Sequence, residues 1–266
     1  MKIIILILLN IIQIYSYILP QTFREWTVIG IENKIDNRNP YHYKIGSLPM
    51  VLWYNKTNIN TIINSCHKHI GNTLKDSYII DNELICPFHK KKYTDDDNMG
   101  VIERRNGLLW WSYKSFNKYP SKIKDNNNNY YLDVKSDFIT LILNFICDFN
   151  GDEYKFYKKK MLMKKGKNYL IYKYPYTLIL NNNYMINIIP KDTENSHIYI
   201  TITKDKSINL KKIKLNIENL YNDFKYKFLL IKDDNSYINK IYNFYKDYMY
   251  PSDITIQYFI KNKRYY

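Results

Sequence analysis

Cysteine and histidine are both scarce in this chain, which has three Cys and five His among 266 residues. Three cysteines allow at most one disulfide. If the chain is exported, Cys66 and Cys86 are the candidate partners and Cys147 is left unpaired. Glycine is also rare, with seven residues, in a composition skewed towards Ile, Asn, Lys and Tyr. An AT-rich genome produces such a skew, so most of the lysines need no functional explanation.

Acidic residues are in deficit, with 25 Asp and Glu against 40 Lys and Arg and a formal net charge of +15. This charge favours acidic partners or anionic surfaces through long-range attraction. No nucleic-acid recognition motif accompanies the charge, so specific nucleic-acid binding is not predicted. A hydrophobic content of 45% with 17% aromatic residues excludes global disorder. The length suits one large domain or two modest ones.

The chain begins with Met1 and Lys2, followed by an apolar run from Ile3 to Leu19. This run is close to the short limit for a membrane span and also suits the core of a signal peptide. We therefore predict that residues 1–20 are a hydrophobic signal or membrane anchor. Without a good cleavage site, an uncleaved anchor is favoured, and the predicted location is membrane-associated or in the secretory pathway. A buried strand or helix is the alternative.

Two short clusters take two of the three cysteines and three of the five histidines: Cys66-His67-Lys68-His69 and Cys86-Pro87-Phe88-His89. Two Cys and two His on two loops about twenty residues apart form the ligand set of a Rieske [2Fe–2S] centre. In that centre thiolates hold one iron and imidazoles hold the other. The sequence predicts a [2Fe–2S] cofactor bound through metal ligands Cys66, His69, Cys86 and His89.

The surrounding sequence resembles the Rieske oxygenase family, whose pattern is C-x-H, a spacer and then C-x-x-H. Sixteen residues separate His69 from Cys86, which agrees with the family's spacer, and Cys86-Pro87-Phe88-His89 matches the second half of the pattern. Further stretches resemble the family's opening, early and closing strands: Trp26-Thr27-Val28, Met50–Tyr54 and Gly107–Trp111.

The first cluster departs from the family pattern because Cys66 lies three residues before His69, and His67 occupies the position expected for cysteine. Three interpretations are open. A one-residue bulge would leave Cys66 and His69 as ligands. His67 would otherwise replace Cys66, or the domain is degenerate and holds no cluster. The bulge is favoured because thiolate is the preferred ligand of iron–sulfur iron.

Short β-branched and aromatic runs separated by turn residues predict an all-β sandwich over residues 21–120. Residues 121–134 contain a polar Asn tract and are predicted to be a linker. Residues 135–266 are predicted to form an α+β domain. The fold class is mainly β / α+β: a Rieske-type sandwich followed by a reduced α+β domain that resembles the helix-grip catalytic domain of the oxygenases. The predicted strands are Met50–Tyr54, Asn60–Ile63, Tyr78–Ile80, Gly107–Tyr113, Tyr169–Tyr174, Thr177–Leu180, Tyr184–Ile189 and Ile198–Thr203; the predicted helices are Leu215–Phe228 and Ser236–Tyr248; Asp137–Phe149 suits either.

The resemblance implies a second, mononuclear iron held by two histidines and a carboxylate, with a D-x-x-H motif. Asp148 stands in the matching stretch, but Gly151 occupies the histidine position, and no histidine lies between His89 and His197. We therefore expect an electron-transfer or oxidoreductase protein without this iron, and no catalytic residue is predicted.

A redox partner protein follows from that expectation. Lys90–Lys92 beside His89 predict that the partner is acidic. The alternatives are an active oxygenase with an unconventional or partner-completed iron site, and a cluster-free binding protein.

Overall fold

The computed structural model describes residues 25–203, with gaps at 47, 57, 67–72, 114–118, 124–127, 137, 150–151, 158–159, 174 and 192–194. The predicted segment 1–20 and the predicted helices Leu215–Phe228 and Ser236–Tyr248 lie outside the described residues. Within the described part of the chain, no helix is both long and apolar enough to cross a membrane.

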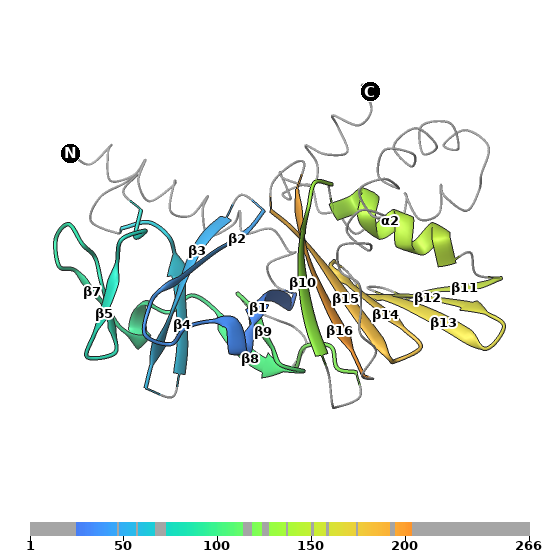
Figure 1. The fold of residues 1–266 in the computed structure, drawn as a ribbon, viewed down its shortest axis with the longest axis horizontal. Coiled ribbons are helices and arrows are strands. Elements are labelled where there is room, and N and C mark those ends of the chain that lie inside the picture. Colours follow the sequence, from blue (N-terminus) through green and yellow to red (C-terminus); the bar gives the residue numbers. More distant parts are fainter. Residues whose placement is uncertain are drawn as a thin grey trace, which may run out of the picture.

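The first half consists of three small antiparallel sheets, each of three strands. Their strand orders are β1-β9-β8, β2-β3-β4 and β5-β6-β7 (Figure 1). The all-β character predicted for this half is confirmed. The strands are β1 (Thr27–Ile31), β2 (Tyr41–Ile45), β3 (Leu48–Asn55), β4 (Asn58–Ile63), β5 (Tyr78–Ile80), β6 (Glu83–Ile85), β7 (Lys92–Tyr93), β8 (Val101–Arg105) and β9 (Leu108–Ser112), with 3₁₀ helices η2 (Glu32–Lys34) and η3 (Asp95–Asp97).

Strand β3 divides the first half into two apolar regions because successive side chains of a strand point to opposite faces. Met50 and Leu52 join the large cluster of buried residues that we call the main core. Val51 and Trp53 face the other way, into a smaller cluster that we call the thiol core. The thiol core consists of Val51, Trp53, Ile62, Cys66, Leu74, Leu84, Cys86 and Tyr93.

The second half is a seven-stranded antiparallel sheet in the order β10-β16-β15-β14-β13-β12-β11, with one described helix, α2 (Phe138–Phe149). The range 121–134, predicted as a linker, contains strand β10, whose residues pair along their whole length with β16. The strands are β10 (Asn128–Val134), β11 (Glu153–Tyr157), β12 (Lys160–Lys165), β13 (Asn168–Lys173), β14 (Thr177–Leu180), β15 (Tyr184–Pro190) and β16 (Ser196–Ile202).

Helix α2 covers one face of this sheet (Figure 1). Phe138, Leu141, Ile142, Phe145 and Ile146 recur at helical spacing and pack in or against the main core. The segment that the sequence left open between helix and strand is therefore a helix. The mainly β / α+β fold class is confirmed.

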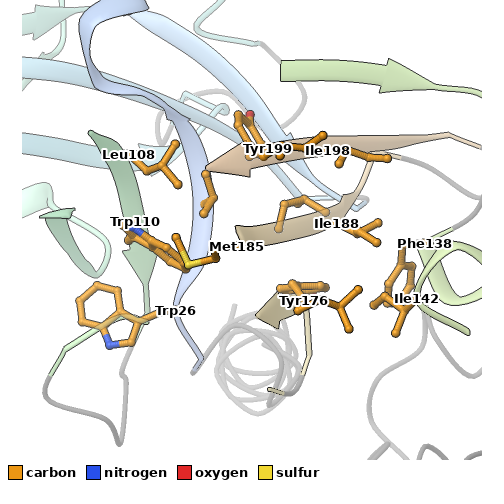
Figure 2. Close-up of a cluster of buried hydrophobic side chains, with 14 of the residues drawn as sticks. Trp26, Leu108, Trp110, Phe138, Ile142, Tyr176, Met185, Ile188, Ile198 and Tyr199 are labelled. Carbon is orange, nitrogen blue, oxygen red and sulfur yellow. The ribbon is translucent and has the colours of Figure 1, made fainter. Parts of the chain in front are cut away.

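The main core runs through both halves of the molecule. It includes Trp26 and Trp110 from the first half and Ile142 and Ile188 from the second, as Figure 2 shows. A backbone hydrogen bond also joins the halves, donated by Gly46 N–H to the Pro190 carbonyl at 2.7 Å. This continuity fixes the sheets of the first half against the large sheet.

Candidate metal centre

The second Cys–His cluster forms a closed loop at the end of β6. The Cys86 N–H donates to the Lys91 carbonyl at 2.9 Å, and the Lys90 N–H donates to the Cys86 carbonyl at 3.1 Å. Lys90 has a φ of 54°, in the left-handed region that a tight return of the chain requires. As a result Cys86 is fully buried while Phe88 and His89 are exposed.

Cys66 follows β4 at the start of the first loop. The side chain of Asn64 connects the two ends of this loop, because its Oδ1 accepts a hydrogen bond from the Leu74 N–H at 2.8 Å. The Asn64 N–H in turn donates to the Pro49 carbonyl of β3 at 2.9 Å. His67 and His69 lie within 67–72, outside the described residues.

The structure brings the two cysteines of the separate loops together. Their Sγ atoms are 3.4 Å apart, no disulfide joins them, and their exposed fractions are 2% and 0%. A disulfide would need a separation of about 2.05 Å. Two thiolates on one tetrahedral metal, with bonds of about 2.3 Å, lie roughly 3.7 Å apart. The donor set of Cys66 and Cys86 therefore fits the thiolate side of a [2Fe–2S] cluster, and the assignment of all four ligands stays a prediction.

The environment of the thiols is mostly apolar, but it includes two polar atoms that lack partners. Trp53 Nε1 and Ser77 Oγ are buried and have no hydrogen-bond partner among the described residues. Ser77 precedes the pair Tyr78–Ile85 of the β5–β6 ladder, and Cys86 follows that pair on the other strand. Sequence reasoning identified neither donor, since a side chain without a partner is recognised only in three dimensions.

The three lysines after His89 have partners of their own. Lys90 Nζ donates to Tyr78 Oη at 2.9 Å, and Lys91 Nζ lies 5.5 Å from the centre of the Tyr93 ring. Lys92 Nζ lies 2.7 Å from Glu83 Oε2, and the hydrogen bond to this carboxylate raises the pKa of Lys92. Glu83 thus offsets one of the three positive charges that the sequence places beside His89.

The stretch that resembles the motif for the mononuclear iron is described only in part. Asp148 belongs to α2, while Gly151 lies outside the described residues. In the part of the chain that the structure describes, no group of three His, Cys, Asp or Glu is placed to hold a metal ion. His197 on β16 has its Nδ1 2.7 Å from Tyr131 Oη and 3.6 Å from Asp133 Oδ1.

A comparison with known protein families finds a match for the part of the chain that contains the two cysteines. The family model of the Rieske [2Fe–2S] domain matches residues 25–111. This stretch of the chain is therefore similar to the Rieske [2Fe–2S] domain, and a [2Fe–2S] cluster is the cofactor that this domain implies. A search of curated proteins gave no match.

Solved structures extend the likeness to the second half. A crystal structure of dicamba monooxygenase is 11% identical, with a TM-score of 0.58 over 91% of this chain and 97% of that chain. NdmA of Pseudomonas putida CBB5 is 12% identical, with a TM-score of 0.53 over 76% of this chain and 78% of that chain. At such identities the likeness shows the fold, which is that of the Rieske non-haem iron oxygenases.

Proposed function

We propose that this chain is a Rieske-type [2Fe–2S] electron-transfer protein built on an oxygenase-like scaffold that lacks the mononuclear iron. The observation that carries the proposal is the pair of buried thiols that lie 3.4 Å apart without a disulfide between them, contributed by two loops of the matched domain. Two reduced cysteines held this close in an apolar core are suited to sharing one iron.

Each predicted ligand has a distinct role in this proposal. Cys66 and Cys86 would hold one iron, and His69 and His89 the other. The cluster supplies a one-electron carrier whose potential histidine ligation raises above that of all-cysteine ferredoxins. The thiol core would keep water from the sulfur side, while the exposed His89 would give the electron a short path to a partner.

The partner follows from the chemistry, because an electron carrier needs a donor and an acceptor. We propose a redox partner protein that docks over the loop of His89. The exposed Phe88 would supply an apolar contact, and Lys90 and Lys91 would attract acidic groups at its rim.

The absence of the second iron is inferred from the sequence. Gly151 stands where the family's pattern needs a histidine, and no histidine occurs between His89 and His197. Imidazole is the usual anchor of this iron. A chain without these ligands would carry electrons and would not activate oxygen by itself.

Metal analysis of the full chain tests the proposal. We expect about two irons and two acid-labile sulfides per chain, a brown colour and a rhombic EPR signal on reduction. His89→Ala should remove the signal, whereas the matched control His42→Gln, on β2, should keep it.

The same measurement separates the two alternatives. About three irons per chain, with substrate-dependent oxygen consumption, would replace the proposal with an oxygenase whose second site is unconventional or partner-completed. Protein purified anaerobically without any iron would replace it with a cluster-free binding protein.

A further inference from the structure

Trp53 lies beside the candidate cluster site as a consequence of strand geometry. It is on the same face of β3 as Val51, which pairs across the sheet with Ile62 of β4. Both of these neighbours belong to the thiol core, and so does Trp53, whose exposed fraction is 0%. The indole is therefore enclosed in the same small apolar region as Cys66 and Cys86.

The indole N–H of Trp53 differs from those of two other buried tryptophans, Trp110 and Trp111. Trp110 Nε1 donates to the Arg105 carbonyl at 3.2 Å, and Trp111 Nε1 donates to the Met99 carbonyl at 2.8 Å. Trp53 Nε1 is buried without a partner among the described residues. A buried tryptophan normally satisfies its N–H, because leaving a donor without an acceptor costs free energy.

The side chains of the thiol core offer few acceptors for the Trp53 N–H. Its side chains are hydrocarbon except for the indole itself, the two cysteine sulfurs and the Tyr93 hydroxyl. Tyr93 is engaged in interactions of its own. Thiolates and bridging sulfides carry negative charge, and a charged acceptor makes the stronger hydrogen bond.

We propose that Trp53 Nε1–H donates a hydrogen bond to a sulfur of the [2Fe–2S] centre and thereby raises its reduction potential. The inference rests on the proposed function. Reduction adds negative charge to the centre, so a donor aimed at sulfur stabilises the reduced form more than the oxidised form. Trp53 is a positioning residue, since it is not itself a ligand of the iron.

Pulsed EPR and redox titration of the full chain test the inference together. The protein is prepared with nitrogen-15 in tryptophan only and reduced, and the nitrogen-15 hyperfine coupling to the cluster is recorded. We expect a coupling in the unsubstituted protein that Trp53→Phe abolishes, and a lower midpoint potential in that variant. The matched control is Trp110→Phe, which removes a buried indole of the main core and should change neither quantity.

The results of these experiments distinguish failure of the Trp53 hydrogen bond from failure of the proposed electron-transfer function. A cluster without nitrogen-15 coupling in the unsubstituted protein overturns the inference and leaves the proposed function standing, whether or not Trp53→Phe folds. A potential that shifts in Ser77→Ala but not in Trp53→Phe also overturns it and assigns the hydrogen bond to the other buried donor. Iron-free protein overturns both ideas.

Discussion

At the scale of single residues, the sequence identified the two thiols and predicted that they share one iron, but it could not supply the distance between them. The pattern of scarce Cys and His identified Cys66 and Cys86, and the structure places their sulfurs 3.4 Å apart. Trp53 could be predicted only as part of a strand. Its proposed role depends on the face of β3 that it occupies and on an N–H that has no partner in the described part of the chain, and both are three-dimensional properties.

The shifted spacing of the first loop leads to a residue-scale prediction. If the loop contains a bulge, His69→Ala should abolish the EPR signal of the cluster, because the imidazole-bound iron loses a ligand. His67→Ala should retain the signal and the iron content. The reverse pattern would make His67 a ligand. Loss of the cluster in both variants would show that the loop needs both imidazoles.

At the scale of elements, strands with turn signals at both ends were predicted within a few residues. Thr177–Leu180 is β14, and Tyr78–Ile80 is β5. Strand β12 was not predicted, because the lysines at both of its ends obscure the alternation of its apolar residues. Met161 and Met163 are buried, while Lys160 and Leu162, before and between them, are half-buried and Lys164 is exposed, so only one face of β12 is core.

Helix α2 could not be told from a buried strand because its sequence is apolar almost throughout. In the structure the segment is a helix that packs against the large sheet, and its Ile142 is fully buried in the main core. We expect Ile142→Ala to lower the free energy of unfolding by about 2–5 kcal/mol through lost contacts and a cavity. Urea unfolding followed by circular dichroism measures this loss.

The exposed Lys135, between β10 and α2, provides the control for that measurement, and Lys135→Ala should be nearly neutral. The EPR signal of the [2Fe–2S] cluster should be the same in Ile142→Ala and Lys135→Ala. Helix α2 packs in the main core, whereas Cys66 and Cys86 lie in the separate thiol core. A loss of well under 1 kcal/mol in Ile142→Ala would contradict the packing described for α2.

At the scale of the whole molecule, the halves meet through tyrosines as well as through the main core. Burial raises the pKa of Tyr43 on β2 and of Tyr199 on β16, and it raises the pKa of Tyr131 on β10 to about 12. Tyr41 on β2 adds electrostatic repulsion to each of the three phenolates. These tyrosines could not be recognised as a group from the sequence, because they come from distant strands.

These raised pKa values predict a loss of stability in alkali. Above about pH 10 the unfolded tyrosines release protons that the folded protein retains, so the free energy of unfolding falls as the pH rises. Below the ordinary tyrosine pKa the full stability is present. Urea midpoints at about pH 9 and about pH 11 measure the fall. Tyr43→Phe should reduce the fall in the urea midpoint between these pH values. Tyr157→Phe, which removes an exposed phenol of β11, should leave that fall unchanged.

The continuous main core also bears on how the metal-binding part can be prepared. Residues 25–111 match a family model, yet Trp26 and Trp110 within that range belong to the main core that both halves build, and Trp110 lies beside Met185 of the second half (Figure 2). A fragment that ends before β10 would expose a large apolar surface to solvent, and such fragments tend to aggregate. Supplying the complementary fragment in the same cell should rescue it, since the two pieces are halves of one folding unit.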